Sequence, residues 1–320
     1  MKWRTEVAIP PGPDPIGYRS RVLLLGSCFA THLSEKLAYY QFPATSNPFG
    51  VLFHPVPVEN LLRRAQEGRY FTTEDLVESQ GRWRCLETHS VLSGSSAEQA
   101  LKQLNRALEA LKEALEHTTH VVLTLGTAYG FRHRKTGQLV ANCHKLPSRE
   151  FERELSAPET LRESLSGILA LLRSARKDRT CLLTVSPVRH IRDGLVENQR
   201  SKAHLITAVH ALAAEGAAAY FPSYELFMDE LRDYRFYDRD LIHPSGAAVD
   251  YVWERFEQAW IDPVARPVME EVAAIRKGLA HRPLHGNSPE YREFRESLET
   301  KIQSLRRRFP QMDFGILRSD

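Results

Sequence analysis

Four short runs of apolar residues recur along the chain, and each is apolar at nearly every position instead of at alternate ones. They lie at residues 21–26, 120–125, 180–185 and 218–221. Uninterrupted apolar runs of this length are typical of strands that are buried on both faces of a parallel sheet. The pattern therefore predicts four strands of one parallel sheet.

Helical patterns separate these runs. They cover residues 28–40, 97–117, 158–176 and 198–216. The second helix carries leucines at 101, 104, 108, 111 and 115, a spacing of three and four that forms one apolar stripe. Strands that alternate with helices are typical of an α/β domain, and right-handed crossovers are the default connection.

The pattern changes after Trp260. Residues 263–277 and 289–308 predict two further helices, and residues 281–288 form a turn-rich linker between them. One face of the last helix carries Tyr291, Phe294, Leu298, Ile302 and Leu305. We therefore expect an α/β domain over residues 18–262 and a helical extension over residues 263–320. The extension either packs on the core or serves in oligomerisation.

Composition narrows the class of protein. A chain of 320 residues with 42% hydrophobic residues, 26% charged residues, 17 Gly and 18 Pro is neither disordered nor collagenous. The formal net charge of +3 gives no reason to expect a nucleic-acid partner. The four cysteines include no C-x-x-C pair, which favours a reducing compartment and no thiol-based zinc ribbon. No apolar run approaches the ~20 residues of a membrane helix, and the first 17 residues lack a signal-like apolar stretch. We expect a cytoplasmic protein without a membrane partner.

Candidate chemistry begins directly after the first predicted strand, at Gly26-Ser27-Cys28. In α/β sheets ligands bind at the carboxyl ends of the strands. A thiol at the start of a helix lies at the positive end of the helix dipole, which predicts a lowered pKa and an accessible thiolate. The alternative is structural: Ser27 caps the helix and Cys28 is a small buried residue.

Further polar residues follow the later strands. Gly126 and Thr127 form a small-residue turn after the second strand, and Asn142-Cys143-His144-Lys145 follows farther on. Residues that could bind an anionic substrate, or be ordinary surface charges, are Arg189, His190, Lys145 and Lys202.

Asp240 and His243 form the strongest local signal. They lie three residues apart on a loop that enters the helix predicted over residues 246–260. An aspartate that accepts a hydrogen bond from one imidazole nitrogen orients the ring, and the other nitrogen can act as a general base.

A nucleophile-bearing turn after the first strand, combined with Asp-x-x-His before the last core helix, resembles the SGNH or GDSL-type hydrolase superfamily. The run Gly26-Ser27-Cys28-Phe29-Ala30 is similar to the GSCFA-domain family. Further motifs that carry this resemblance are Asn47-Pro48-Phe49-Gly50, Leu125-Gly126-Thr127, Asn142-Cys143-His144-Lys145, Ser186-Pro187-Val188-Arg189, Ser201-Lys202, Tyr220-Phe221-Pro222-Ser223-Tyr224-Glu225 and His243-Pro244-Ser245. The similarity covers roughly residues 20–260.

The resemblance implies a flavodoxin-like three-layer sandwich and a set of roles. Cys28 falls on the nucleophile position of the superfamily and Ser27 on its aspartate position, with Ser27 as the alternative nucleophile. His243 becomes the base and Asp240 its orienting partner.

The resemblance also implies an oxyanion hole, which donates hydrogen bonds to the negative oxygen that forms during acyl transfer. Gly50, with Asn47 beside it, matches one donor of the superfamily. The turn Gly126-Thr127-Ala128 departs from the superfamily, because alanine stands where an asparagine donor is expected. Asn142 or His144, next to Lys145, are candidate replacements. Loss of such a donor typically costs ~3 kcal/mol of transition-state stabilisation.

A cysteine nucleophile forms a thioester, which favours acyl transfer as well as hydrolysis. We therefore expect an ester hydrolase or acyltransferase with a Cys-His-Asp triad, no cofactor, and a small-molecule or carbohydrate-linked acyl substrate. Two alternatives stay open. One is a catalytically degenerate protein that only binds a ligand, and the other is a metal site at Cys28, Cys143, His144 and His243.

Overall fold

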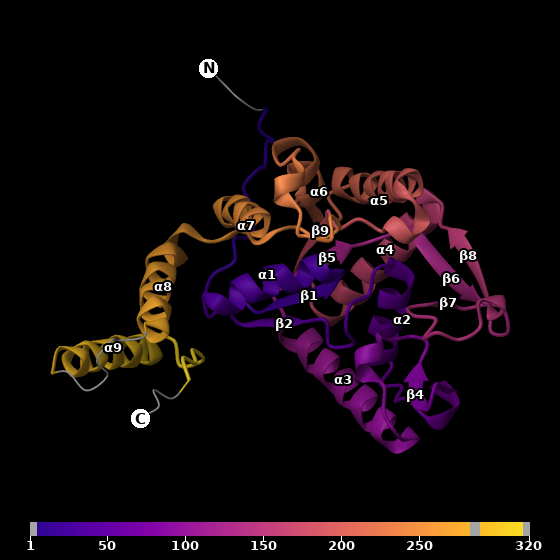
Figure 1. Cartoon of the computed structure of the whole chain (residues 1–320), viewed down its shortest axis with the longest axis horizontal. Helices are drawn as coiled ribbons and strands as arrows, with labels where there is room; N and C mark the ends of the chain where they lie inside the picture. The colour runs from indigo at the N-terminus through magenta and orange to yellow at the C-terminus, as the bar shows by residue number, and fades with distance from the viewer. Residues whose placement is uncertain (1–4, 282–288, 316–320) are drawn as a thin grey trace.

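A five-stranded parallel sheet forms the centre of the molecule (Figure 1). It is seen in a computed structural model that describes residues 5–281 and 289–315. Most of the linker predicted at 281–288 therefore lies outside the described residues. From edge to edge the strands are β10 (Ala219–Tyr220), β9 (Thr180–Val185), β5 (His120–Leu125), β1 (Val22–Gly26) and β2 (Ala44–Ser46). All four predicted strands are present, and all pairings are parallel.

Helices cover both faces of the sheet. One hydrophobic cluster joins one face to α2 (Pro55–Gln66), α3 (Ala97–His117), α4 (Pro158–Ala175) and α5 (Leu195–Ala214). A second cluster joins the opposite face to α1 (Cys28–Tyr39) and α7 (Gly246–Trp260). Successive residues of β1 alternate between the two clusters, since neighbouring side chains of a strand point to opposite faces. The fold is thus the expected three-layer α/β sandwich.

The order of the strands fixes where a ligand site belongs. Numbered in chain order within the sheet, the strands lie 2-1-3-4-5, the flavodoxin-like doubly wound order. The chain leaves β1 toward β2 on one side and later returns to place β5 on the other side. The carboxyl ends of β1 and β5 therefore border the switch point, where open α/β sheets bind ligands.

Two small antiparallel sheets escaped the sequence analysis. One pairs β3 (Leu76–Ser79) with β4 (Arg82–Cys85), and the other contains β7 (Leu139–Val140), β6 (Tyr129–His133) and β8 (Phe151–Leu155). Strands β3, β4, β6 and β8 mix polar and apolar residues and are partly exposed, and β7 has only two residues, so none has an apolar run of strand length. Strand β2 was missed for a related reason, because it has only three residues and none is fully buried.

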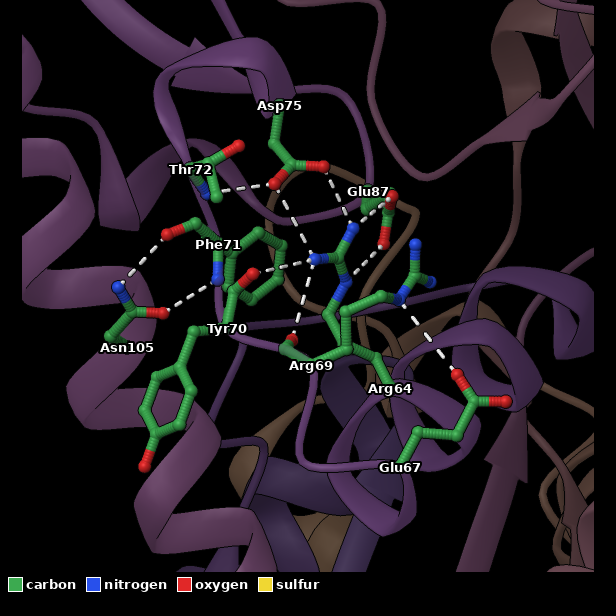
Figure 2. Close-up of polar contacts among 9 residues, drawn as sticks. All are labelled: Arg64, Glu67, Arg69, Tyr70, Phe71, Thr72, Asp75, Glu87 and Asn105. Carbon is green, nitrogen blue, oxygen red and sulfur yellow. Dashed lines mark hydrogen bonds and ion pairs between the residues drawn. The ribbon is translucent and has the colours of Figure 1, made fainter.

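A buried arginine ties the first of these insertions to the helical layer (Figure 2). Arg64, at the end of α2, has 1% of its side chain exposed and bonds both Asp75 and Glu87. Its guanidinium donates to Asp75 at 2.8 Å and to Glu87 at 2.9 and 3.2 Å. The same group lies 4.1 Å from the ring centre of Phe71.

The C-terminal helices are present as predicted. Helices α8 (Arg266–Ala280) and α9 (Pro289–Arg308) extend from the end of α7 to one side of the sheet (Figure 1). Leu298, Ile302 and Leu305 of α9 belong to the same apolar cluster as α1 and α7. Their use in oligomerisation stays a prediction.

Shorter helical segments complete the described chain. The single-turn α6 (Ser223–Glu225) leads into a π-helical turn, Leu226–Glu230. The 3₁₀ turns are Thr73–Asp75, Ser90–Leu92, Ser148–Glu150, Ile191–Asp193, Tyr234–Phe236 and Pro263–Ala265. Among the described helices, none has both the length and the apolar character needed to cross a membrane.

Candidate functional site

The turn after β1 requires glycine at its first position. Gly26 has a φ of +120°, and a Cβ added there would lie 2.0 Å from the Thr124 carbonyl oxygen. Ser27 then donates its N–H to the same carbonyl at 2.9 Å. The Ser27 hydroxyl accepts a hydrogen bond from the Phe29 N–H at 3.4 Å and is 1% exposed. Ser27 is therefore the buried cap of α1, and Cys28 is the more accessible of the two candidate nucleophiles.

Cys28 is the first residue of α1 and is partly exposed. Burial raises the pKa of its thiol, and a backbone hydrogen bond opposes this effect only in part. The lowered pKa expected at the start of the helix is therefore wrong, because the loss of hydration outweighs the backbone hydrogen bond. Cys28 needs a base to become a nucleophile at neutral pH.

Asp240 and His243 meet as the sequence predicts. The Asp240 Oδ2 lies 2.6 Å from His243 Nδ1. The other carboxylate oxygen accepts the backbone N–H groups of Ile242 and His243 at 2.9 and 3.0 Å. The hydrogen bond from His243, followed by these two N–H groups, lowers the pKa of Asp240 to about 2. Asp240 is therefore a carboxylate at neutral pH and fixes the imidazole with Nε2 on its outer side.

The loop that carries this pair is held at the start of α7. Leu241 adopts a left-handed conformation with a φ of +59°, and the Asp238 N–H donates to the His243 carbonyl at 2.7 Å. Ser245 caps α7 by accepting the Ala248 N–H at 3.4 Å. Arg189, which follows β9, donates its N–H to the Ile242 carbonyl at 3.4 Å. The loop is thereby fixed against the carboxyl end of β9.

Helices α1 and α7 lie side by side in one layer (Figure 1). Lys36 of α1 forms an ion pair with Asp250 of α7, and Tyr40 stacks on Trp253 with ring centres 5.7 Å apart. Cys28 is the first residue of α1, and His243 lies three residues before the first residue of α7. Both therefore lie at the same edge and on the same face of the sheet. Within the described residues no hydrogen bond joins the two side chains.

Asn47 and Gly50 are the first pair of expected oxyanion donors, and they differ in whether an N–H donor is left unbonded. Asn47 accepts the Gly26 N–H on Oδ1 at 2.8 Å, and its Nδ2 is buried without a partner among the described residues. Gly50 donates its N–H to the Asn47 carbonyl at 2.8 Å. A Cβ on Gly50 would lie 2.4 Å from the His89 Cβ. Gly50 is therefore required for packing, and Asn47 is the residue that retains a donor.

The backbone N–H groups of the turn after β5 are already bonded to other parts of the protein. The N–H groups of Gly126 and Thr127 both donate to the Phe53 carbonyl, at 2.8 and 3.2 Å. The Thr127 hydroxyl lies 2.9 Å from the Ser201 hydroxyl, which also accepts the Ala128 N–H at 2.7 Å. Ala128 itself is fully buried. The turn thus has a structural role, and its backbone leaves no donor for a ligand.

The segment from Asn142 to Lys145 also has a structural role. The Asn142 side chain accepts the His144 N–H at 2.8 Å, and His144 Nε2 lies 2.7 Å from the Cys85 carbonyl oxygen. The His144 carbonyl accepts hydrogen bonds from Ser79 and Arg84 of the β3–β4 hairpin. This segment therefore fastens the hairpin, and no bond between described residues links it to Cys28 or His243.

The structure also tests the alternative of a metal site formed by Cys28, Cys143, His144 and His243. Burial raises the pKa of Cys143 to about 11, so this cysteine is a poor source of thiolate. Throughout residues 5–281 and 289–315 no three His, Cys, Asp or Glu side chains gather as a metal site requires. The structure does not bring Cys28, Cys143, His144 and His243 together.

Lys202 is not a surface charge. It is 1% exposed, and its Nζ donates to the carbonyls of Gly126 and Ser186 at 2.6 and 2.7 Å. Burial lowers the pKa of this amine to about 7. Lys202 fastens the ends of β5 and β9 together. The sequence held a signal for this burial, since Asn198, Ser201, Lys202 and Leu205 follow the three-and-four spacing of a buried helix face.

A cavity of about 730 Å³ lies at the opposite edge of the sheet. Its walls include Val22 at the start of β1, Thr118 before β5, and Gln311 beyond α9. It is therefore separated from Cys28 by the length of the strands. Gln311 and Phe309 also contact Tyr18 there, so this cavity belongs to the docking of the C-terminal segment.

Comparison with known families agrees with these motifs. A model described as the GSCFA family matches residues 21–256, and one described as the C-terminal domain of GSCFA domain proteins matches residues 272–316. No curated protein matches the chain.

Proposed function

This chain belongs to the GSCFA family, and we propose that it is a thiol-dependent ester hydrolase or acyltransferase of the SGNH or GDSL-type superfamily. Cys28 is the nucleophile, His243 the general base and Asp240 its orienting partner. The observation that carries the proposal is the 2.6 Å pair of Asp240 and His243 on the same edge and face of the sheet as Cys28. The switch point between β1 and β5 is the expected place for such a site.

The chemistry follows from these three side chains. The Cys28 sulfur bonds to the carbonyl carbon of the ester while its proton moves to His243 Nε2. The tetrahedral intermediate then breaks its bond to the leaving oxygen, which takes the proton back from the imidazolium. A thioester on Cys28 remains. Water or an acceptor hydroxyl bonds to the thioester carbonyl carbon while its proton moves to His243. The carbon–sulfur bond then breaks, and the Cys28 sulfur takes the proton back from the imidazolium.

Asp240 contributes orientation and charge. As a carboxylate with a pKa of about 2, it accepts the Nδ1 proton of His243 and stabilises the imidazolium that forms during each step. Cys28 and His243 have to approach each other when substrate binds. Catalytic hydrogen bonds that are long in a free enzyme commonly form only in the substrate complex.

A second candidate is a protein that keeps the fold but only binds an acyl ligand. The observation that favours it is the internal use of the Gly50, Gly126 and Thr127 N–H groups. Without enough donors for an oxyanion, such a site would hold an ester without cleaving it. Formation of an acyl-enzyme separates the two candidates.

The substrate class, compartment and partners are part of this proposal. We place the protein in the cytoplasm, acting on a small-molecule or carbohydrate-linked acyl group without a cofactor. The four cysteines are free in the structure, in keeping with a reducing compartment. Helices α8 and α9 are the proposed elements of oligomerisation.

Burst kinetics with p-nitrophenyl acetate test the proposal. We expect wild-type protein to release p-nitrophenol while one acetyl group is added to the chain, and Cys28→Ala to abolish that addition. His243→Ala should slow it by about 10²–10⁴-fold, the usual contribution of a general base.

Ser27→Ala is the matched control. It should retain the burst and lose about 1 kcal/mol of stability, the typical value of a helix cap. An unchanged burst in Cys28→Ala, or no acetyl addition to folded wild-type protein, would contradict the proposal.

A further inference from the structure

His190 presents an imidazole nitrogen that the protein itself does not use. Its Nε2 is buried and has no hydrogen-bond partner among the described residues. A buried polar group without a partner is costly, and each such group in a native structure calls for an explanation. A ligand that accepts a hydrogen bond would supply the missing partner.

The ring lies directly over the turn after β5. A Cβ added to Gly126 would lie 3.2 Å from His190 Nε2 and 2.9 Å from the Phe53 ring. Glycine at this position therefore leaves the room that the imidazole occupies. His190 thus stands at the end of β5, where the superfamily places its third oxyanion donor and where this chain has the buried Ala128.

Neighbouring elements hold the ring in place. The His190 N–H donates to Asn198 Oδ1 of α5 at 2.9 Å, and the imidazole meets Phe53 edge-on with ring centres 5.0 Å apart. Arg189, the preceding residue, is fixed over the Tyr237 ring at 3.9 Å. A donor whose backbone is tied to α5 and whose ring packs on Phe53 is suited to stabilise a transition state, because it need not reorganise during the reaction.

A chain of backbone hydrogen bonds connects this ring to the nucleophile. The Leu52 N–H donates to the Gly26 carbonyl at 2.9 Å, and Phe53 accepts the Gly126 N–H at 2.8 Å. Residues 52–53 therefore bridge the ends of β1 and β5. Cys28 follows one end of this bridge, and His190 packs against the other.

The imidazole is neutral under physiological conditions. Burial, followed by repulsion from the charge of Lys202 and from that of His243 when it is protonated, lowers the pKa of His190 to about 3. A neutral imidazole with its proton on Nε2 donates one hydrogen bond, and it does not compete with His243 for the Cys28 proton. Neutral histidines are suited to this electrophilic role.

We propose that His190 donates from Nε2 to the oxyanion of the tetrahedral intermediate and so replaces the donor that Ala128 lacks. The Cys28 N–H, which begins α1 and has no partner within the helix, and Asn47 Nδ2 complete the set. This inference rests on the proposed acyl-transfer function, and it assigns to His190 a contact with the reacting atoms.

Two reactions of Cys28 distinguish donation to the oxyanion from an effect of His190 on the thiol or on the fold. Acylation by p-nitrophenyl acetate passes through an oxyanion, whereas alkylation by iodoacetamide displaces iodide at a saturated carbon and forms none. We expect His190→Leu to lower the acylation rate by about 10²–10³-fold, the usual effect of losing one such donor. The alkylation rate of Cys28 should be unchanged. His190→Gln, which retains an N–H donor of similar reach, should recover part of the acylation rate.

His210→Leu is the matched control. His210 lies on α5 with its side chain 53% exposed, away from the candidate site, and its loss should affect neither reaction. An acylation rate in His190→Leu equal to that of wild type would overturn the role of His190 while leaving Cys28 as nucleophile. An equal fall in both reactions would also overturn it, since His190 would then act on the thiol or the fold. Absence of any acyl group on wild-type Cys28 would overturn the proposed function itself.

Discussion

Ser27 and Cys28 are neighbours, yet their surroundings assign them different chemistry. The Ser27 hydroxyl is buried as the cap of α1, while the Cys28 thiol is accessible but has a raised pKa. A thiol with a raised pKa is protonated at neutral pH. The proposed reaction therefore needs general-base catalysis by His243, as distinct from a preformed pair of thiolate and imidazolium.

The pH dependence of Cys28 alkylation tests this at the scale of the residue. Only the thiolate reacts with iodoacetamide, so the rate should rise about tenfold per pH unit until the pH exceeds the pKa of the thiol. Because burial raises that pKa, the rise should continue above the pH at which an unstructured cysteine peptide reaches its plateau.

Peptide-level mass spectrometry follows each cysteine separately, so Cys85 and Cys143 serve as internal controls beside the free cysteine peptide. Burial raises the pKa of Cys85 to about 12 and that of Cys143 to about 11, so both should label more slowly than Cys28. A plateau for Cys28 below that of the free peptide would instead indicate a stabilised thiolate and contradict the general-base account.

Four residues at the candidate site show how far sequence reasoning reaches at this scale. Asp240 and His243 were predictable, because a three-residue spacing on one loop brings the two side chains together by local geometry alone. Lys202 and His190 were identified only as possible anion-binding charges. Their roles depend on Gly126, Ser186 and Phe53, which come from other elements, and no local pattern encodes such contacts.

At the scale of elements, the layer formed by α1 and α7 positions the site, and α2 anchors the β3–β4 insertion. Arg64 is the centre of that anchor (Figure 2). The Arg64 side chain is 1% exposed, while the side chains of Asp75 and Glu87 are 22% and 19% exposed. The arrangement is costly to break, because removal of the arginine leaves two carboxylates close together without a cation.

Arg64→Met should therefore destabilise the protein. We expect the free energy of unfolding to fall by about 3 kcal/mol, the lower end for removing one partner of a buried ion pair, since water partly screens both carboxylates. Denaturant unfolding followed by circular dichroism measures this difference.

The adjacent Arg63 supplies the control. It is 51% exposed and pairs with Glu59 at 2.9 Å, so Arg63→Met should change the free energy of unfolding by less than about 1 kcal/mol. Equal effects of the two substitutions would mean that burial of Arg64 contributes nothing to stability.

The elements themselves were predictable to different degrees. Long apolar runs and most amphipathic helices were found with small errors at their ends; the predicted helix 198–216, for example, is Leu195–Ala214 in the structure. Helix α2 (Pro55–Gln66) was missed. Some of the strands that were missed obtain their order from pairing with segments farther along the chain. Thus β6 pairs with β8 across a loop, Tyr129 opposite Leu155, and neither strand has an apolar run of its own.

At the scale of the whole molecule, the candidate site and the docked C-terminal segment lie at opposite edges of the sheet. The carboxyl edge holds Cys28, the Asp240–His243 pair and His190. At the amino edge the segment beyond α9 returns to the core, where Gln311 donates to the Tyr18 carbonyl at 3.1 Å and Phe309 packs against the Tyr18 ring. The C-terminal helices therefore complete the apolar cluster beneath α1 and α7, and their contacts lie away from the candidate nucleophile.

The proposed function requires an acyl group to be bonded to the Cys28 sulfur, and the most direct measurement locates that group on the chain. Wild-type protein is treated with p-nitrophenyl acetate, quenched in acid, digested and analysed by mass spectrometry of the peptide that contains Ser27 and Cys28. We predict one acetyl group on the Cys28 sulfur, which neutral hydroxylamine removes as it does other thioesters. An acetyl group on Ser27 that resists neutral hydroxylamine, or no acetyl group on this peptide, would contradict the account.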